Sequence, residues 1–186
     1  MLQVKVQDKT FFVPEKWEEV SVKQFADLDR FRAELNPARV MSIFTGIDYG
    51  WILNADPKEI EVKLLSCMHF LGSDVDVAKF VRPDYILIAG RRFDVPKAIR
   101  NETYGQKMYI QELVNDGVKR KLPIYDLIPM ALAIYFQPAF DDKPFDDKRA
   151  EALKPMMSHL PICDAYPVAG FFLKKYIQLL NKKSKN

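Results

Sequence analysis

Histidine, cysteine and glycine are scarce in this chain, which has 2 His, 2 Cys and 7 Gly among its 186 residues. The glycine-rich loops that cradle phosphates, G-x-x-x-x-G-K-[ST] and G-x-G-x-x-G, are missing, and so is the G-x-S-x-G turn of hydrolases. Two histidines also leave little material for a general base. We therefore expect neither an enzyme nor a bound cofactor.

Long apolar runs and a large excess of one charge are missing as well. No stretch approaches the ~18 apolar residues of a membrane span, and the first ten residues have no apolar core of signal-peptide length. Basic residues number 28 against 25 acidic ones, so no broad basic surface favours nucleic acid. Two cysteines give no disulfide framework, which favours a reducing cytoplasm.

The one concentrated basic run lies at the C-terminus. Lys182, Lys183 and Lys185 are candidates for contact with phosphates or with an acidic partner, and the alternative is a solvated chain end. Arg91 and Arg92 precede Phe93, and we interpret them as solvated arginines of a turn. A regulator that binds nucleic acid stays an alternative, which salt-dependent retention on DNA would reveal.

Apolar residues make up 48% of the chain and aromatic residues 12%, which predicts a folded globular protein with a sizeable core. Its most informative feature is a near-repeat: FFVPEKWEEVSVKQ at 11–24 and FDVPKAIRNETYGQ at 93–106, 82 positions apart. The matches fall at a strand core, a strand end and a helix cap: Phe11/Phe93, Val13/Val95, Pro14/Pro96, Ser21/Thr103 and Gln24/Gln106. They favour an internal duplication, and the alternative is two unrelated hairpins with common turn chemistry.

The first copy predicts a β-hairpin over 4–13 and then a helix that begins at the capping box Ser21–Gln24. Apolar residues at helical spacing extend that helix to Leu35. A second helix is expected over 38–45, closed by Gly46, and a third from Asp56 to Leu71 with Gly72 as its stop.

The second copy predicts a hairpin over 85–95 around Ala89-Gly90, and a capping box at Thr103–Gln106. The helix behind that box, with Met108 among its apolar residues, should stop at 115–117, and an apolar helix should span 127–136 around Pro129. A loop over 137–148 then leads to helices over 149–159, where Pro155 kinks or ends the helix, and 164–180.

The expected fold is α+β and predominantly helical, with two hairpin-plus-helix-pair units that share one core. The first unit covers 1–82, and the second covers 83–186 with the C-terminal helix and the basic tail. A single compact domain is the alternative. An isolated two-stranded hairpin is only marginally stable in water, so each hairpin needs to be covered by helices or by the other hairpin.

Two groups of residues raise the question of a metal site. Cys67, His69, His159 and Cys163 are the inventory of a zinc site, but residues two apart on a helix cannot face one ion. We prefer buried thiols and hydrogen-bonded histidines. Four aspartates at 141–142 and 146–147 attract hard cations in principle, yet the neighbouring Lys and Arg favour a solvated loop with a helix cap at Asp146.

Aromatic residues exceed what two short helices need to cover hairpins. They gather in LAIYFQP at 132–138 and YPVAGFFLKKY at 166–176. We assign Phe136 and Phe171 to the core. Tyr135, Phe140 and Phe172 are candidate partner-facing residues, because aromatic side chains often anchor interfaces.

The segments VPEKWEEVSVKQF, LAIYFQPAFDD, KRAEAL and DAYPVAGFFLK together resemble a diffuse class of small proteins encoded by tailed bacteriophages, including the crAss-like phages of gut bacteria. The resemblance implies a virion structural or adaptor protein of the neck or tail region, acting through protein–protein contacts. The alternative is a tail-assembly chaperone that binds an apolar helix of another phage protein. Implied partners are other phage structural proteins, with a homo-oligomeric ring as one arrangement, in the virion or in the cytoplasm of the infected host.

Overall fold

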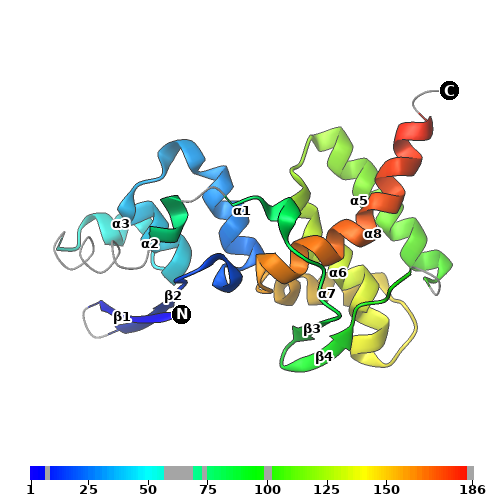
Figure 1. Cartoon of the computed structure of the whole chain (residues 1–186), viewed down its shortest axis with the longest axis horizontal. Coiled ribbons are helices and arrows are strands. Elements are labelled where there is room, and N and C mark those ends of the chain that lie inside the picture. The colour runs from blue at the N-terminus through cyan, green and yellow to red at the C-terminus, as the bar shows by residue number, and fades with distance from the viewer. Residues whose placement is uncertain (7–8, 57–68, 73–74, 99–101, 184–186) are drawn as a thin grey trace.

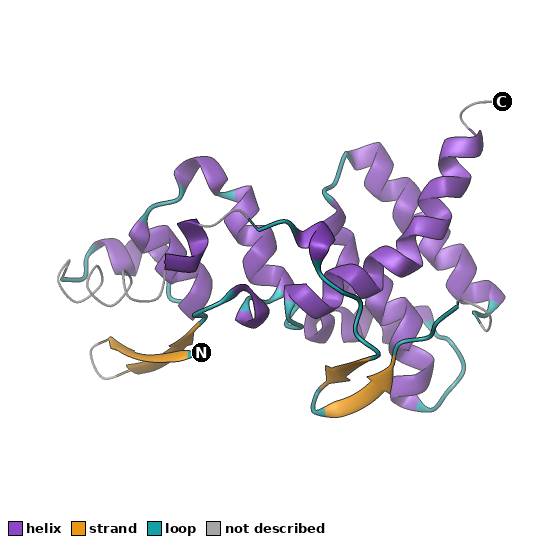
Figure 2. Ribbon diagram, in the orientation of Figure 1, coloured by secondary structure: helices purple, strands orange, loops and turns teal. Residues whose placement is uncertain are grey.

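The computed structural model describes residues 1–6, 9–56, 69–72, 75–98 and 102–183 (Figure 1). This part of the chain is predominantly helical, with two small antiparallel sheets of two strands each (Figure 2). The α-helices are α1 Val22–Arg30, α2 Pro37–Thr45, α3 Tyr49–Leu53, α5 Tyr104–Arg120, α6 Ile124–Asp141, α7 Asp147–Met157 and α8 Ile162–Lys183. The strands are β1 Leu2–Val6, β2 Lys9–Val13, β3 Tyr85–Ile88 and β4 Arg91–Asp94. Short 3₁₀ turns lie at Trp17–Glu19, Arg32–Glu34, His69–Gly72 and Val77–Lys79.

Both predicted hairpins are present. β1 pairs with β2 from Leu2 opposite Val13, and β3 pairs with β4 from Tyr85 opposite Asp94. The second hairpin turns through Ala89 at φ 50° and Gly90 at φ 76°. Positive φ at both central residues is the type I′ geometry, which matches the twist of the flanking strands.

Both predicted capping boxes are also confirmed. Ser21 Oγ accepts from Gln24 N at 3.2 Å while Gln24 Oε1 accepts from Ser21 N at 2.9 Å. Thr103 and Gln106 exchange the same two bonds at 3.2 and 2.9 Å. Each box satisfies two backbone donors that the first turn of a helix would otherwise leave free.

The two glutamines make a further contact that the sequence did not predict. Gln24 Nε2 donates to the carbonyl of Phe44 in the last turn of α2, at 3.3 Å, and Gln106 Nε2 donates to the carbonyls of Ile134 and Tyr135 in α6, at 3.0 and 3.2 Å. Pro138 stands four residues after Ile134 and has no N–H, so the Ile134 carbonyl lacks its helical donor. Gln106 supplies the missing hydrogen bond inside the core.

α6 is the central helix of the second half. Leu127, Ile128, Ala131, Leu132, Ala133, Ile134 and Phe136 are all buried, and α5, α7, α8 and α1 pack around it. A helix that is apolar on all sides needs such cover. Its one buried polar side chain, Gln137, accepts from the Asp146 amide at 2.9 Å and donates to Asp141 at 3.0 Å, which holds the turn into α7.

The first half departs from the predicted helix ends. α1 stops at Arg30 rather than Leu35, and Leu35 is 40% exposed. The chain turns back so that the Arg39 guanidinium of α2 lies 4.6 Å from the Phe31 ring and 3.6 Å from the Tyr49 ring. α2 and its left-handed Gly46 cap match the prediction. Most of the helix expected over Asp56–Leu71 lies outside the described residues.

The second half corrects two boundaries. α5 runs through 115–117 to Arg120, because Gly117 is a packing position and not a stop: a Cβ there would lie 2.8 Å from Leu127 Cδ1. The expected loop over 137–148 is confined to 142–146, since α6 continues to Asp141 and α7 begins at Asp147. Pro155 lies inside α7.

The two halves lie side by side, with both hairpins on the same side of the molecule (Figure 1). A short bridge joins them: Val22 N donates to Leu160 O at 2.9 Å, and Ile162 N donates to Val20 O at 2.8 Å. One cluster of buried apolar residues extends through both halves. Within the described ranges, no helix combines the length and the apolar character needed to cross a bilayer.

Candidate functional site

The described residues contain no group of three or more His, Cys, Asp or Glu placed to hold a metal ion. Cys67 lies outside them, and so does the His69 side chain. His159 is exposed in the turn before α8, and Cys163 is partly buried in its first turn. The aspartates have other partners: Asp146 accepts from Arg149 N at 2.9 Å, as the predicted cap, and Asp147 accepts from the Tyr109 hydroxyl.

Cys163 is a poor nucleophile in this setting. Burial, together with the negative charges of Asp164 and Glu18, raises the pKa of its thiol to about 11. Because the thiolate is the reactive form, the thiol stays protonated and inert near neutral pH.

We therefore expect alkylation of Cys163 by iodoacetamide at pH 8 to be on the order of 10-fold slower than that of free cysteine, because the smaller thiolate fraction outweighs the greater nucleophilicity of a thiolate with a high pKa. The Cys67→Ser chain leaves a single thiol to follow by mass spectrometry. The rate should keep rising about tenfold per pH unit above pH 8 and level off only near pH 11. Rapid alkylation at pH 7 would show that the site activates the thiol instead.

Of the three predicted partner-facing aromatics, one is buried and two are partly buried. Phe172 is 1% exposed, so its assignment to a partner contact is wrong in this structure: its ring stacks on Tyr135, with centroids 3.7 Å apart. Tyr135 is partly buried there. Phe140 is partly buried too, stacked on Phe93 at 5.8 Å with the Arg91 guanidinium 5.1 Å above it. Phe136 is in the core as predicted.

The arginines of the second hairpin are not merely solvated. Arg91 donates to the Phe140 carbonyl at 2.9 Å, and Arg92 lies 4.2 Å from the Tyr85 ring. The Arg91 contact fixes the hairpin to the end of α6, whereas the Arg92 contact lies within the hairpin, between β4 and β3. At the C-terminus, Lys182 and Lys183 lie in the last turn of α8, but their side chains and Lys185 fall outside the described part of the chain.

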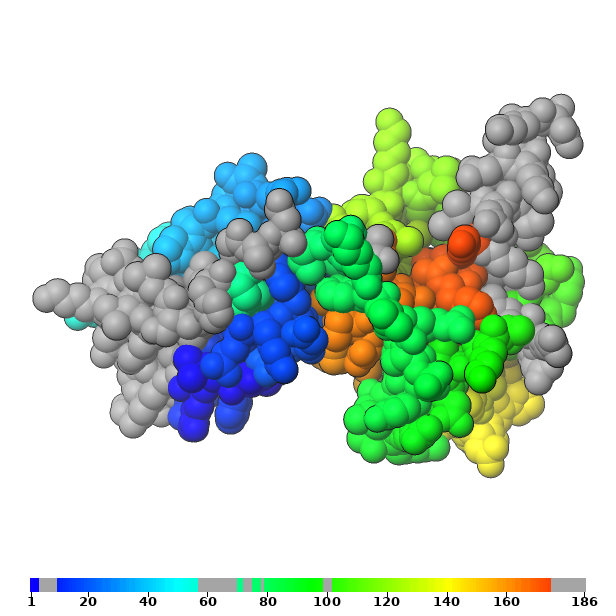
Figure 3. Space-filling view, viewed as in Figure 1, coloured from blue at the N-terminus to red at the C-terminus, as the bar shows by residue number. Residues whose placement is uncertain are grey.

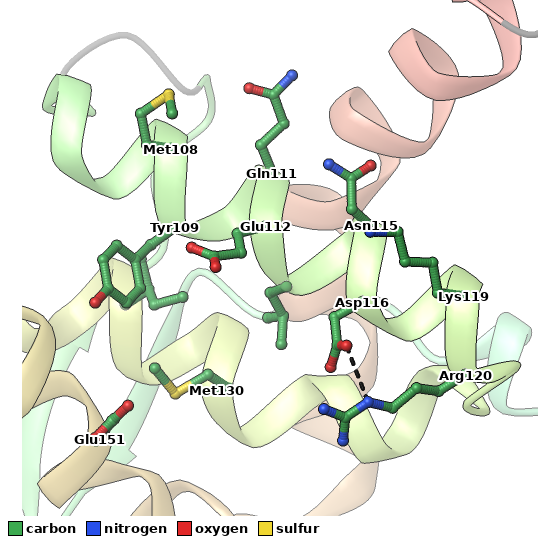
Figure 4. A pocket seen from close by; sticks show the side chains of 12 residues that line it. Met108, Tyr109, Gln111, Glu112, Asn115, Asp116, Lys119, Arg120, Met130 and Glu151 are labelled. Atoms are coloured by element: carbon green, nitrogen blue, oxygen red, sulfur yellow. Dashed lines mark ion pairs between the residues drawn. The ribbon is translucent and has the colours of Figure 1, made fainter.

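A hollow of about 640 Å³ lies on the exposed side of α5, where α6 and α7 form the opposite wall. Figure 4 shows Tyr109 and Glu112 of α5 facing Met130 of α6 and Glu151 of α7. Met108 lies at one end of the hollow and is 46% exposed, although it is one of the apolar residues expected in this helix. We call this hollow the α5 groove.

Charge is unevenly distributed along the α5 groove. Glu112 and Glu151 stand near Tyr109, and neither has an ion-pair partner among the described residues. At the other end Lys119 is accompanied by Arg120, whose Nε lies 2.9 Å from Asp116.

The hydrogen bond to Asp147, burial and the nearby carboxylates raise the pKa of Tyr109 to about 12, so its hydroxyl remains a proton donor at neutral pH.

Sequence reasoning missed the α5 groove because it forms between the side chains of three successive helices, and the sequence does not show how these helices pack against one another. The only local signal was the surplus of apolar residues on α5, where Tyr104 and Val118 are 76% and 66% exposed. No family model, curated protein or solved structure matches the chain.

Proposed function

We propose that this chain is a structural or adaptor protein of a tailed-bacteriophage particle, in the neck or tail region, and that it acts through protein–protein contacts. Its partners are other phage structural proteins, and a homo-oligomeric ring is one arrangement of its copies. Its place is the virion, or the infected host's cytoplasm during assembly. The sequence resemblance suggests this class, and the α5 groove is the observation that carries the mode of action.

The α5 groove has the features of a site for a partner helix. Methionine side chains adapt to irregular surfaces, and here Met108 and Met130 provide apolar contact between free carboxylates. A helix about 10 Å wide with an apolar face fits such a groove. Glu112 and Glu151 would favour a partner helix with Lys or Arg at the matching end.

We also propose that the two hairpin–helix units, 1–82 and 83–186, descend from one duplicated unit. The two glutamines support this. The Gln24 side chain donates to the carbonyl of Phe44, 20 residues later in the chain. The Gln106 side chain donates to the carbonyl of Ile134, 28 residues later. The difference of eight equals the difference in length between α1 with 9 residues and α5 with 17. A lengthened first helix accounts for the shift, because the shorter linker of the second unit and the position of Ile134 deeper in α6 offset each other at three residues each.

The experiment is mass spectrometry of purified particles of the phage that encodes the chain. We expect the chain at a copy number typical of a ring or a multiple of it. The second candidate, a tail-assembly chaperone that holds an apolar helix in the α5 groove, predicts the chain in infected cells and its absence from particles. Absence from both particles and assembly intermediates would refute the proposal.

The groove itself can be tested in the same particles. We expect the Met108→Arg, Glu112→Lys double variant to be depleted from them by about tenfold, because it removes an apolar anchor and reverses a charge. Val118→Arg is the matched control, since Val118 is exposed on α5 but does not line the groove. Equal incorporation of both variants would exclude the groove as the contact.

A further inference from the structure

The outer edge of β3 is a second candidate contact surface. β3 pairs with β4 on one side only. The two-residue turn places Ile88 and Arg91 in a hydrogen-bonded pair, and Val95 N donates to Asp84 O at 2.8 Å. Hydrogen-bonded and non-hydrogen-bonded pairs alternate in an antiparallel ladder. Tyr85 and Leu87 are therefore in non-hydrogen-bonded pairs, and their backbone N–H and C=O groups point away from β4. No described residue pairs with these groups.

The side chains at this edge are apolar and accessible. Tyr85 is 44% and Leu87 is 55% exposed, while Ile86 and Ile88 face the core at 2% and 0%. Free edges of natural sheets are commonly protected by charged residues, proline or a bulge. The strand itself, Tyr-Ile-Leu-Ile, contains none of these.

A cleft of about 330 Å³ lies beside this edge. Its lining comes from β3 and the preceding Pro83 on one side, and from Leu160, Pro161 and Asp164 at the α7–α8 turn on the other. Figure 3 shows a hollow in the surface between the blue N-terminal part and the green second hairpin, and orange residues form the floor of this hollow. The cleft is therefore open beside a strand edge that can still form hydrogen bonds.

The one charged residue that lines the cleft is acidic, and the nearby Arg92, whose guanidinium lies 4.2 Å from the Tyr85 ring, is ion-paired with Asp94 at 3.1 Å. Asp164 is partly buried in its wall and has only a weak contact with the Cys163 thiol, at 3.9 Å. Asp84 is exposed at the start of β3, and no Lys or Arg is among the lining residues. A basic side chain is the complement of such a site.

We propose that β3 accepts an extended segment of a partner protein as a third strand, with an apolar side chain in the cleft and a Lys or Arg facing Asp164. Main-chain hydrogen bonds would give affinity, and the cleft would give side-chain selectivity. A second copy of this chain suits the edge less well, because its own Pro83–Gly90 segment has one Asp and no basic residue. The inference goes beyond the proposed function and does not require a phage origin.

The test measures binding of a fluorescent peptide to the full chain by anisotropy. The probe is a blocked peptide of about seven residues with alternating valine and threonine and one central lysine. Leu87→Pro removes an outward N–H without breaking the ladder to β4, since proline is tolerated on that side of an edge strand. We expect binding to weaken at least about fivefold, whereas Leu87→Val, which keeps the donor, should bind as the unmodified chain does.

Two further arms make the test specific. Replacing the peptide's lysine by glutamate should weaken binding to the unmodified chain, and Asp164→Asn should reduce that preference. If Leu87→Pro lowers the unfolding midpoint, peptides N-methylated on alternate residues decide instead, because only methylation of the edge facing β3 should abolish binding. Detection of the chain in particles is independent of these results, so the two proposals can fail separately.

Three results would overturn the inference. One is the lack of saturable binding up to about 1 mM peptide. Another is equal binding of the lysine and glutamate peptides. The third is a concentration-dependent dimer of the chain alone that Leu87→Pro abolishes, which would assign the edge to a second copy.

Discussion

Phe172→Ala should lower the free energy of unfolding by about 3–5 kcal/mol, the largest effect that we expect from a single substitution. Phe172 is 1% exposed and lies between two other rings: it stacks on Tyr135 at 3.7 Å and meets Phe136 edge to face at 6.0 Å. Truncation would remove these contacts and leave a cavity where α8 packs on α6. Urea unfolding followed by circular dichroism measures the loss.

The matched control is Tyr104→Ala. Tyr104 is 76% exposed at the start of α5, so its truncation should change the free energy of unfolding by less than about 0.5 kcal/mol. If Phe172→Ala unfolded at the same urea concentration as the unmodified chain and lost a binding partner instead, the original assignment of Phe172 to an interface would be correct.

Gln106→Ala should cost about 2–4 kcal/mol, from the lost helix cap and from a buried carbonyl left without a donor. Gln106 is 6% exposed, and its side chain makes two hydrogen bonds to the backbone. Its Oε1 accepts from the Thr103 amide at 2.9 Å, and its Nε2 donates to the Ile134 carbonyl at 3.0 Å. Gln24→Ala is the natural comparison, because Gln24 makes the corresponding bonds in a part-buried setting. We expect Gln24→Ala to cost less.

Pro138→Ala tests the reason for the effect. It gives position 138 an N–H that can donate to the Ile134 carbonyl, as in a regular helix. In that background the cost of Gln106→Ala should fall by about 1 kcal/mol, measured as the coupling in a double-mutant cycle. Strict additivity of the two substitutions would show that Gln106 stabilises the fold by its cap alone.

The two proposed contact surfaces belong to different elements. The α5 groove is formed by α5, α6 and α7, whereas the β3 edge belongs to the second hairpin and faces the α7–α8 turn. An adaptor must hold two neighbours at once, so two separate surfaces of different chemistry suit that role. The helix-binding groove and the strand-binding edge can be inactivated independently, by Met108→Arg with Glu112→Lys and by Leu87→Pro.

Local features were predictable because a few adjacent residues determine them. A two-residue turn of this type needs positive φ, which Gly90 adopts without steric cost and Ala89 also takes, at 50°. A capping box needs only Ser21 with Gln24, or Thr103 with Gln106. Helix ends were less predictable. Gly117 has the sequence character of a stop, yet Leu127 packs against it from the next helix and α5 continues.

The sequence by itself determined the two hairpins, the caps that start α1 and α5, the Gly46 end of α2 and the scarcity of catalytic residue types, because each depends on composition or on neighbours within about four positions. Tertiary structure alone decided that Phe172 is core, that Gln106 completes the hydrogen bonding of α6 and that Met108 borders a groove. These outcomes depend on which helix lies opposite. The helical pattern of a sequence shows only which face of a helix is apolar. Which helix packs against that face is decided by contacts between residues far apart in the chain, such as Gln106 with Ile134 and Tyr135 with Phe172.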